Sequence, residues 1–287
     1  MVSTELLPER SVSRPPRIPQ SGPIASRLEL LSELVRRDVR SRYRGSMLGV
    51  GWTLLNPLIF MAVYALVFAK FLKVHYPGGA PIVFILCGLL AWTFFSQALI
   101  MATNSIVGSA PLIRKVAFPW ELLSTSAVVA ALVNYTISLV LLVPFMLLAH
   151  KGLSFPIVAA VPLVLITFLL ALGIGLMLAA ANVYMRDLTY LVNLGTLVWF
   201  YITPVIYPFT LVQTKFSGHG LLGVLAHFVL YANPMTWVVI GFHDVFVFDR
   251  WPVHWHGLCY SFVFSLVMVG LGTLVFGRLR RRFAEEV

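Results

Sequence analysis

Six long apolar runs without any Asp, Glu, Lys, Arg or His dominate the chain. They are Gly51–Ala69, Pro81–Thr103, Leu122–Ala149, Ile157–Val183, Tyr190–Thr210 and Gly257–Gly277. Each reaches the ~18–20 residues with which an α-helix crosses a hydrocarbon core about 30 Å thick. The pattern therefore predicts an all-α integral membrane protein with six transmembrane helices, at about 51–72, 81–103, 121–149, 156–183, 190–210 and 257–277.

The chain changes character twice before the first run. Residues 1–26 are rich in Pro, Ser and Arg and poor in apolar side chains, which predicts a disordered cytoplasmic tail. In residues 27–46 the apolar side chains fall on one arc of a helical wheel and most charged ones on the opposite arc. This predicts an amphipathic interface helix lying flat on the membrane. Because Arg27, Asp38 and Arg42 sit on or beside the apolar arc, we expect the helix to dock on protein as well as on lipid.

Two apolar stretches between the fifth and sixth runs are too short to be full crossings. They are Gly220–Tyr231 and Met235–Phe248, separated by Asn233 and Pro234. Stretches of this length are typical of re-entrant or interfacial segments. The sequence therefore predicts a re-entrant helical hairpin at 218–250, in preference to a seventh span that would weaken the charge asymmetry described below.

The remaining boundaries follow from polar breaks. Asn56 and Pro57 interrupt the first span and predict a kink or a break there. The basic segment 104–120, between the second and third spans, could hold a short cytoplasmic helix or be a plain basic loop. The membrane domain is expected to cover 47–280, followed by a cytoplasmic C-terminus at 281–287.

The charges are distributed unequally between the two sides of the membrane. With six crossings, 16 of the 21 Lys and Arg residues fall on the side of the N-terminus, and the other side holds only Lys70, Lys73, Lys151, Lys215 and Arg250. The positive-inside rule then places both termini in the cytoplasm. A nucleic-acid partner is not favoured by the net charge of +10, because the arginines bracket spans and form no free basic domain.

The absence of charge inside the runs weakens the case for several mechanisms. Proton relays, ion pumps and intramembrane metal centres need ionisable groups at membrane depth. The chain also has no G-x-x-x-x-G-K-[ST] phosphate-binding loop and no H-E-x-x-H motif. It is therefore not expected to be an enzyme by itself, and the energy source of any transport is expected on another chain. Cys87 and Cys259 lie within runs and are interpreted as small apolar residues.

Ligand-type side chains cluster in one place, near the end of the second short apolar stretch. The cluster consists of His243, Asp244, Asp249, His254 and His256. Its spacing matches no closed metal site, and the intervening Phe and Trp residues favour a membrane-surface loop. A membrane glycosyltransferase or ligase that uses this loop is the alternative from a different class of protein.

Aromatic residues are the other candidate for function. Phe60, Tyr64 and Phe68 repeat every four residues in the first span, and the fifth run is crowded with Trp199, Phe200, Tyr201, Tyr207 and Phe209. Flat rings with polar edges can stack on sugars and still let a polymer slide. For any single ring, helix packing or an interfacial aromatic belt is the better-supported explanation.

Four segments carry a family resemblance. They are Arg37–Pro57, Leu112–Leu122, Asn182–Pro208 and Ala232–Met235. In order and spacing they resemble the permease subunit of type-2 ABC exporters, in the branch that exports lipid-linked polysaccharides such as O-antigen, capsule and teichoic acid. The resemblance covers about residues 30–280. It implies a bacterial inner-membrane protein that forms a homodimer and binds two copies of a separate ABC ATPase; ATP and Mg would bind to that ATPase, with no cofactor on this chain.

The resemblance also implies roles for particular residues. A cytoplasmic coupling helix would use Arg114 and Lys115 to contact the ATPase. The channel would lie between protomers, lined mainly by spans one and five, with Tyr64, Phe68, Trp199 and Tyr201 as the expected lining residues. The short outer helices would act as a gate.

The basic interface helix suggests where a substrate would be taken up. Arg40, Arg42 and Arg44 could attract the pyrophosphate of a polyprenyl-linked polysaccharide at the inner leaflet, since guanidinium groups pair strongly with phosphate. Membrane lipids are further expected partners of this helix. An exporter of the same fold for a drug, haem or another lipid is the alternative function.

Overall fold

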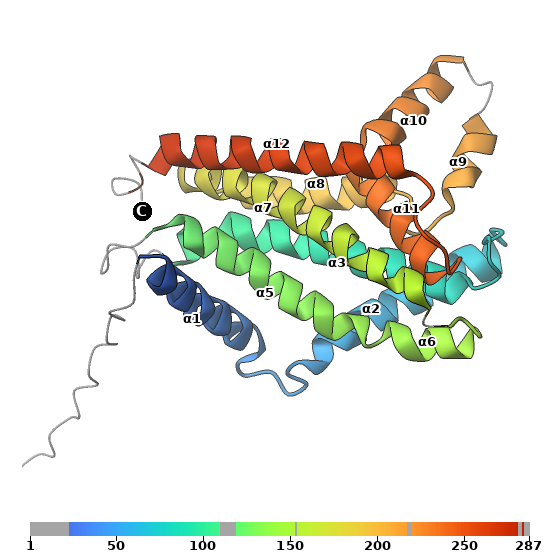
Figure 1. The fold of residues 1–287 in the computed structure, drawn as a ribbon, viewed down its shortest axis with the longest axis horizontal. Coiled ribbons are helices and arrows are strands. Elements are labelled where there is room, and N and C mark those ends of the chain that lie inside the picture. The colour runs from blue at the N-terminus through green and yellow to red at the C-terminus, as the bar shows by residue number, and fades with distance from the viewer. Residues whose placement is uncertain (1–22, 110–118, 153, 217–219, 281–282, 284–287) are drawn as a thin grey trace, which may run out of the picture.

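The computed structural model describes residues 23–109, 119–152, 154–216, 220–280 and 283, and all of its regular elements are helices. Figure 1 shows them as an elongated bundle. In chain order they are α1 Pro23–Tyr43, α2 Gly51–Tyr64, the π-helix η1 Ala65–Phe71, α3 Pro81–Asn104, the 3₁₀ helix η2 Val107–Ser109, α5 Glu121–Leu139, α6 Leu142–Leu148, the 3₁₀ helix η3 Phe155–Ala159, α7 Ala160–Tyr184, α8 Leu188–Ile202, α9 Phe209–Phe216, α10 Gly220–Ala232, α11 Pro234–Phe246 and α12 Trp255–Leu279.

The described residues contain five helical segments long and apolar enough to cross a membrane. They are Gly51–Phe71, Pro81–Asn104, Glu121–Leu148, Phe155–Tyr184 and Trp255–Leu279. The pair α10 and α11 passes the same test only when taken together, with a bend of 75° between its arms. The chain is therefore a multi-pass membrane protein with five or six crossings by length and composition, and five of the six predicted spans coincide with these segments.

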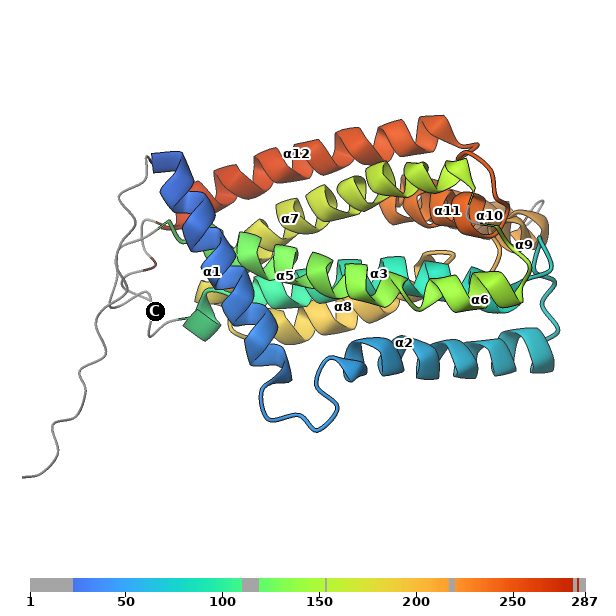
Figure 2. The same cartoon turned by 60° about the horizontal axis from the view of Figure 1, so that its bottom comes forward.

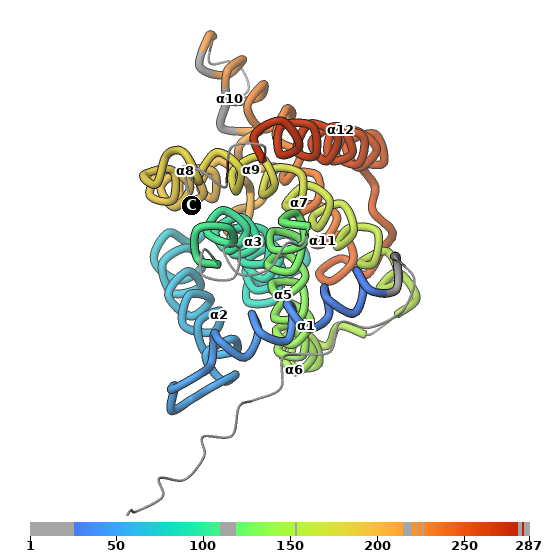
Figure 3. Tube along the Cα trace, turned by 90° about the vertical axis from the view of Figure 1, so that its left-hand side faces the viewer, coloured from blue at the N-terminus to red at the C-terminus, as the bar shows by residue number. Residues whose placement is uncertain are grey.

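Helix α3 is the centre of the bundle. Seen along the bundle in Figure 3, it is surrounded by α2, α5, α7, α8 and α11. Of its most apolar stretch, 78% is buried, against 39% for the third and fourth segments. Small side chains allow the closest helix contact, between α7 and α12, where a Cβ added to Gly173 would lie 2.4 Å from the carbonyl carbon of Met268. Such close backbone approach is typical of helix pairs in membranes.

Helix α1 crosses one end of the bundle obliquely and packs on α5 (Figure 2). Leu34 is buried in this contact, and Asp38 Oδ2 accepts a hydrogen bond of 2.9 Å from Ser126 Oγ. The expectation that this helix docks on protein is therefore confirmed. It begins at Pro23, inside the segment predicted as a disordered tail, because proline fits the first helical turn. It ends before Gly45, whose φ of 79° leaves the helical region, so the predicted end at residue 46 was wrong.

The first span remains helical through its proline. Pro57 lacks the N–H that would bond the carbonyl of Thr53, yet α2 continues unbroken to Tyr64. Ser138 Oγ on α5 donates to the freed Thr53 oxygen at 3.3 Å. Because a neighbouring hydroxyl replaces the missing donor, the helix tolerates Pro57 at membrane depth.

The fifth predicted span, 190–210, is not one continuous helix. Helix α8 ends at Ile202, and Thr203 adopts the extended conformation (ψ 136°) that a residue before proline prefers. Residues 203–206 are buried, and irregular backbone is tolerated at membrane depth when it is covered by protein. The prediction was wrong because hydropathy alone does not register the helix-ending effect of Pro204.

The predicted break at Asn233 and Pro234 coincides with the junction of α10 and α11. Asn233 caps α11 by accepting a hydrogen bond of 3.0 Å from the N–H of Met235. Both helices lie toward one end of the bundle, and α1 and the C-terminal end of α12 lie at the other end (Figure 1). The pair fits a broken span or a re-entrant loop by length and composition, so the predicted re-entrant hairpin stays a prediction.

Candidate functional site

An exposed apolar surface formed by α2, η1 and α8 is the main candidate site. We call it the α2–α8 face. On α8 the exposed large side chains recur with helical spacing, at Tyr190, Leu191, Leu194, Leu197, Val198 and Tyr201. On α2 they include Trp52, Leu55, Ile59, Phe60 and Val63. Only 11% of the first span is buried within the chain, much less than any other span, so this segment has too few partners in its own protomer.

Aromatic rings connect the two helices of the α2–α8 face. The centroid of Tyr64 lies 6.3 Å from that of Phe60 and 6.4 Å from that of Phe68 along the first span. It also lies 5.7 Å from Phe200 on α8. Tyr64 and Phe68 are half-buried, whereas Tyr201 is 53% exposed. The structure therefore brings three of the four predicted lining residues, Tyr64, Phe68 and Tyr201, to one side of the bundle.

Trp199 faces the inside of the bundle instead. Its ring lies 5.1 Å from Phe95 and 6.2 Å from Trp92, both on α3. Its indole Nε1 donates a hydrogen bond of 2.9 Å to Asn233 Oδ1. These contacts anchor α8 to α3 and to the α10–α11 junction, so a direct lining role for Trp199 is not supported by its position in this structure.

A wide groove continues the α2–α8 face at the end of the bundle away from α1. Its volume is about 990 Å³, and its lining includes Phe68, Tyr201, Tyr207, Lys73 and His75 with aliphatic residues of α9 and α10. A groove with rings, one cation and few other polar groups can contact a sugar polymer over a broad area without holding it at one point.

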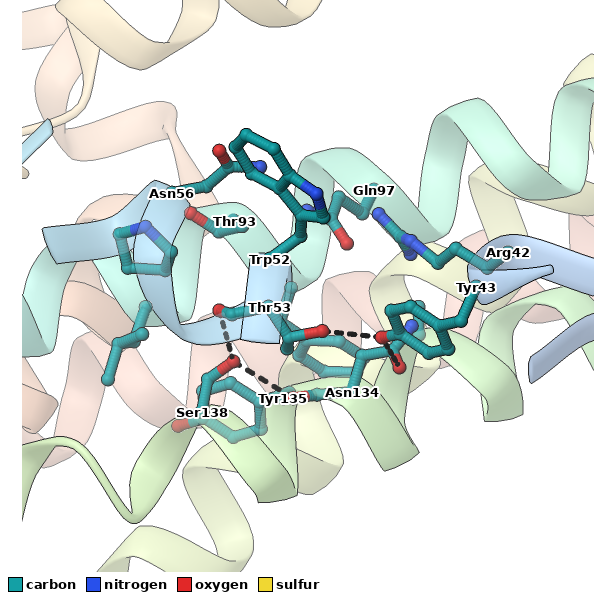
Figure 4. Close-up of a pocket in the computed structure, with 14 residues that line it drawn as sticks. Arg42, Tyr43, Trp52, Thr53, Asn56, Thr93, Gln97, Asn134, Tyr135 and Ser138 are labelled. Carbon is teal, nitrogen blue, oxygen red and sulfur yellow. Dashed lines mark hydrogen bonds between the residues drawn. The ribbon is translucent and has the colours of Figure 1, made fainter. Parts of the chain in front are cut away.

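The three predicted uptake arginines differ in their surroundings. All are exposed, but only Arg42 lines a cavity, where it meets residues of α2, α3 and α5 (Figure 4). Its Nη1 lies 3.4 Å from Met101 Sδ, and no ion pair is found for it within the described chain. Arg40 and Arg44 line none of the cavities described.

The predicted ATPase-coupling residues Arg114 and Lys115 lie outside the described residues. The flanking positions are well packed. Trp120 stacks on Phe283 with centroids 5.6 Å apart, and Arg280 pairs with Glu121 at 2.5 Å. Phe283, in the predicted cytoplasmic C-terminus, is fully buried and so ties that segment to the start of α5.

The residues of the His and Asp cluster have separate structural roles. His243 is buried and stacks on Phe84 with a centroid distance of 3.6 Å. Asp244 pairs with Arg250 at 2.6 Å and accepts from the N–H of Val253, which closes the turn after α11. In the part of the chain that the structure describes, no group of three His, Cys, Asp or Glu residues could hold a metal ion.

Sequence reasoning missed two buried asparagines. Asn134 Oδ1 on α5 accepts a hydrogen bond of 2.7 Å from the hydroxyl of Tyr43. Asn233 Nδ2 donates to Thr203 Oγ1 at 2.9 Å, and its Oδ1 accepts from Trp199. Each joins helices distant in sequence. A polar amide in or beside an apolar run is the signal that could have identified them, since it must find a partner when buried.

Charged side chains occur only at the ends of the five long spans, at Lys70, Glu121 and Arg278. These features define a multi-pass helical membrane protein with an exposed aromatic face.

Comparison with known proteins identifies the family. Residues 29–247 match the family described as "ABC-2 type transporter", and the chain belongs to it. It is 33% identical over 258 residues to the O-antigen export system permease protein RfbA of Myxococcus xanthus, covering 90% of this chain and 95% of that protein. Two proteins of the same name from Klebsiella pneumoniae are 27% and 25% identical, each covering 90% of this chain and 94% of the relative. The resemblance inferred from the four sequence segments is thereby confirmed.

Proposed function

We propose that this chain is the permease subunit of an ABC exporter that moves a polyprenyl-pyrophosphate-linked polysaccharide, such as an O-antigen, from the cytoplasmic to the outer side of the bacterial inner membrane. The aromatic α2–α8 face is the observation that carries the proposal. It offers a polymer rings to slide over, and α2 and α8 themselves carry no charged side chain that would hold it. The names of the relatives, all O-antigen permeases, support the same cargo.

The proposed assembly is a homodimer with two ATPase subunits. The sparse packing of the first span favours a second copy against the α2–α8 face, which would place the channel between protomers. ATP and Mg would bind to the ATPase, and the segment around Arg114 and Lys115 would transmit its closure. Helix α1, which carries several arginines, and the C-terminal end of α12, whose last turn carries Arg278, lie toward the same end of the bundle (Figure 1), which supports cytoplasmic termini.

Loss of the chain tests the cargo. In the native bacterium, deleting this gene should abolish surface polysaccharide and cause lipid-linked glycan to accumulate on the cytoplasmic side, with both restored by the wild-type gene. Altered drug sensitivity with unchanged surface polysaccharide would support a drug exporter and contradict the proposal. Reconstituted without an ATPase, the chain should transport no glycan, whatever proton gradient is applied, because no titrating relay crosses its described spans.

The uptake role of α1 has its own test. Replacing Arg40, Arg42 and Arg44 together with Gln should reduce export at least about tenfold while the protein still assembles, because charge-assisted phosphate contacts are lost. The matched control is Arg36→Gln, on the same helix but paired with Glu33. Undiminished export by the triple variant would remove the uptake role from these arginines.

A further inference from the structure

The cavity beside Arg42 has an unusual lining for a site among apolar helices. Four helices meet there, α1, α2, α3 and α5, and the volume is about 160 Å³, on the order of ten times the minimum for one water molecule. The lining residues with polar side-chain groups are Arg42, Tyr43, Trp52, Thr53, Asn56, Thr93, Gln97, Asn134, Tyr135 and Ser138. No Asp or Glu is among the 14 lining residues.

One wall of the cavity is held by hydrogen bonds that leave a donor free. The hydroxyl of Tyr43 lies 2.5 Å from Thr53 Oγ1 and donates to Asn134 Oδ1 at 2.7 Å. Asn134 is only 3% exposed, yet its Nδ2 has no hydrogen-bond partner in the described chain. Leaving a buried N–H unpaired costs free energy, so a ligand that accepts a hydrogen bond from it is favoured.

The other groups of the lining also favour an acceptor. Arg42 contributes a guanidinium without an ion pair, and the side-chain amides of Asn56 and Gln97 can both donate. Thr93 and Ser138, in contrast, already donate to backbone oxygens. Together these lining groups make the cavity cationic, rich in hydrogen-bond donors and free of carboxylates. Such a cavity suits an anion and repels a metal cation.

The position of the cavity selects the kind of anion. It lies where α1 ends and α2 begins, at the junction of the amphipathic helix and the first span (Figures 2 and 4). Trp52, 43% exposed, lies at this junction, and indoles are enriched at headgroup level. Because the cavity lies between spans at the level of the lipid headgroups, we expect its anion to be attached to a lipid.

We propose that this cavity binds the phosphate of a polyprenyl-linked substrate, with Arg42 as the cation and the Asn134 amide as the deepest donor. The identity of the occupant rests on the proposed export function, whereas the phosphate chemistry rests on the lining alone. The site assigns different roles to the three predicted arginines: Arg42 binds the phosphate, while Arg40 and Arg44 lie outside the cavity.

Direct binding tests the proposal. The full chain in phosphate-free maltoside detergent is titrated with radiolabelled farnesyl pyrophosphate, and unlabelled farnesol, inorganic pyrophosphate and dioleoyl phosphatidylglycerol compete. Farnesyl pyrophosphate should bind, and farnesol should not displace it. Displacement by farnesol would show that the isoprenoid chain and not the phosphate is recognised, and no binding to the wild type would show that the cavity takes up no phosphate; either result would overturn the proposal. Equally strong competition by phosphatidylglycerol would overturn the assigned occupant, and equally strong competition by inorganic pyrophosphate would overturn attachment to a lipid.

Two variants locate the binding. Asn134→Asp keeps an oxygen for the Tyr43 hydroxyl but replaces the free N–H with an acceptor, and should weaken binding at least about tenfold. Gln97→Glu changes the lining in the same way at a position that is only half-buried, and tests the site even if the first variant fails to fold. The matched control Gln213→Glu, on α9 far along the chain, should leave the Kd within about twofold. Unchanged binding in both cavity variants would overturn the site.

Export measured in cells separates this inference from the proposed function. If the cavity variants lose binding but export glycan normally, the phosphate site is not part of transport and the proposed function stands. If the wild-type chain binds farnesyl pyrophosphate while its deletion leaves surface polysaccharide intact, the export function fails and the phosphate site stands.

Discussion

At the scale of single residues, several polar side chains in the apolar spans are paired across helices. Ser138 compensates for Pro57, and Tyr43 joins α1 to Asn134 and Thr53. Such bonds fix the docking of one helix on another, because an unpaired polar group in hydrocarbon is costly. The same reasoning explains Asp38, which departs from the amphipathic pattern of α1 because it receives a hydrogen bond from α5.

The Tyr43 contact gives a stability prediction. Tyr43→Phe removes the hydroxyl that bridges Thr53 and Asn134, so the free energy of unfolding should fall by about 1–2 kcal/mol. The control Tyr190→Phe, at a 77% exposed ring, should change it by less than about 0.5 kcal/mol. Denaturant titration of the detergent-solubilised chain, followed by circular dichroism, measures both. Equal effects of the two variants would show that the Tyr43 bridge does not stabilise the fold.

At the scale of helices, backbone contacts decide the packing. Prolines end or divide the helices at Thr203 and Asn233, and the buried side chain of Asn233 then joins α8 to α11. Glycines determine how closely α7 and α12 approach each other. A Cβ on Gly272 would lie 2.3 Å from the carbonyl oxygen of Gly173, so the two glycines face each other across this contact.

This glycine contact predicts an asymmetric effect of adding one methyl group. Gly173→Ala should force α7 and α12 apart and lower the free energy of unfolding by about 1–3 kcal/mol. Gly270→Ala, on α12 with no atom within 4 Å of the added Cβ, should be neutral or stabilising by up to about 1 kcal/mol. The same denaturant titration compares them. A stable Gly173→Ala variant would contradict the assigned close packing.

At the scale of the whole molecule, one side of the bundle is insufficiently covered. The first span has the lowest buried share of any span, and the aromatic rings of α2 and α8 lie beside each other there. A second copy would cover this side, and that is the proposed origin of the channel. The exposed residues of α12 are also largely apolar, but they belong to a helix that packs extensively on α7.

Cross-linking distinguishes these two apolar sides. In a Cys259→Ser background, Leu194→Cys on the α2–α8 face should give covalent dimers in membranes treated with a short bismaleimide. Val263→Cys, 58% exposed on α12, should remain monomeric although it is about as accessible as Leu194, which is 59% exposed. Gel electrophoresis under denaturing conditions reports the result. Dimers formed only through Val263→Cys would place the protomer interface on α12.

The sequence by itself determined where the helices lie and what the spans lack. Hydropathy, charge placement and prolines act locally along the chain, so the runs, the break at Asn233 and the absence of charges within the runs could be read directly. The family was also legible from short segments. The end of α8 was predicted wrongly, although Pro204 was visible, because the apolar run continues past it.

Only the tertiary structure decided which side chains meet. Trp199 and Tyr201 are two positions apart on α8, so they face different sides of a helix, and only the packing of α3 determined that Trp199 is the inner one. Likewise, Arg42 differs from Arg40 and Arg44 because α2, α3 and α5 surround a cavity at its position. The oxygen of the Asn134 amide accepts a hydrogen bond from Tyr43, 91 residues away in the sequence. Such contacts depend on how distant helices dock, and one-dimensional periodicity carries no information about that.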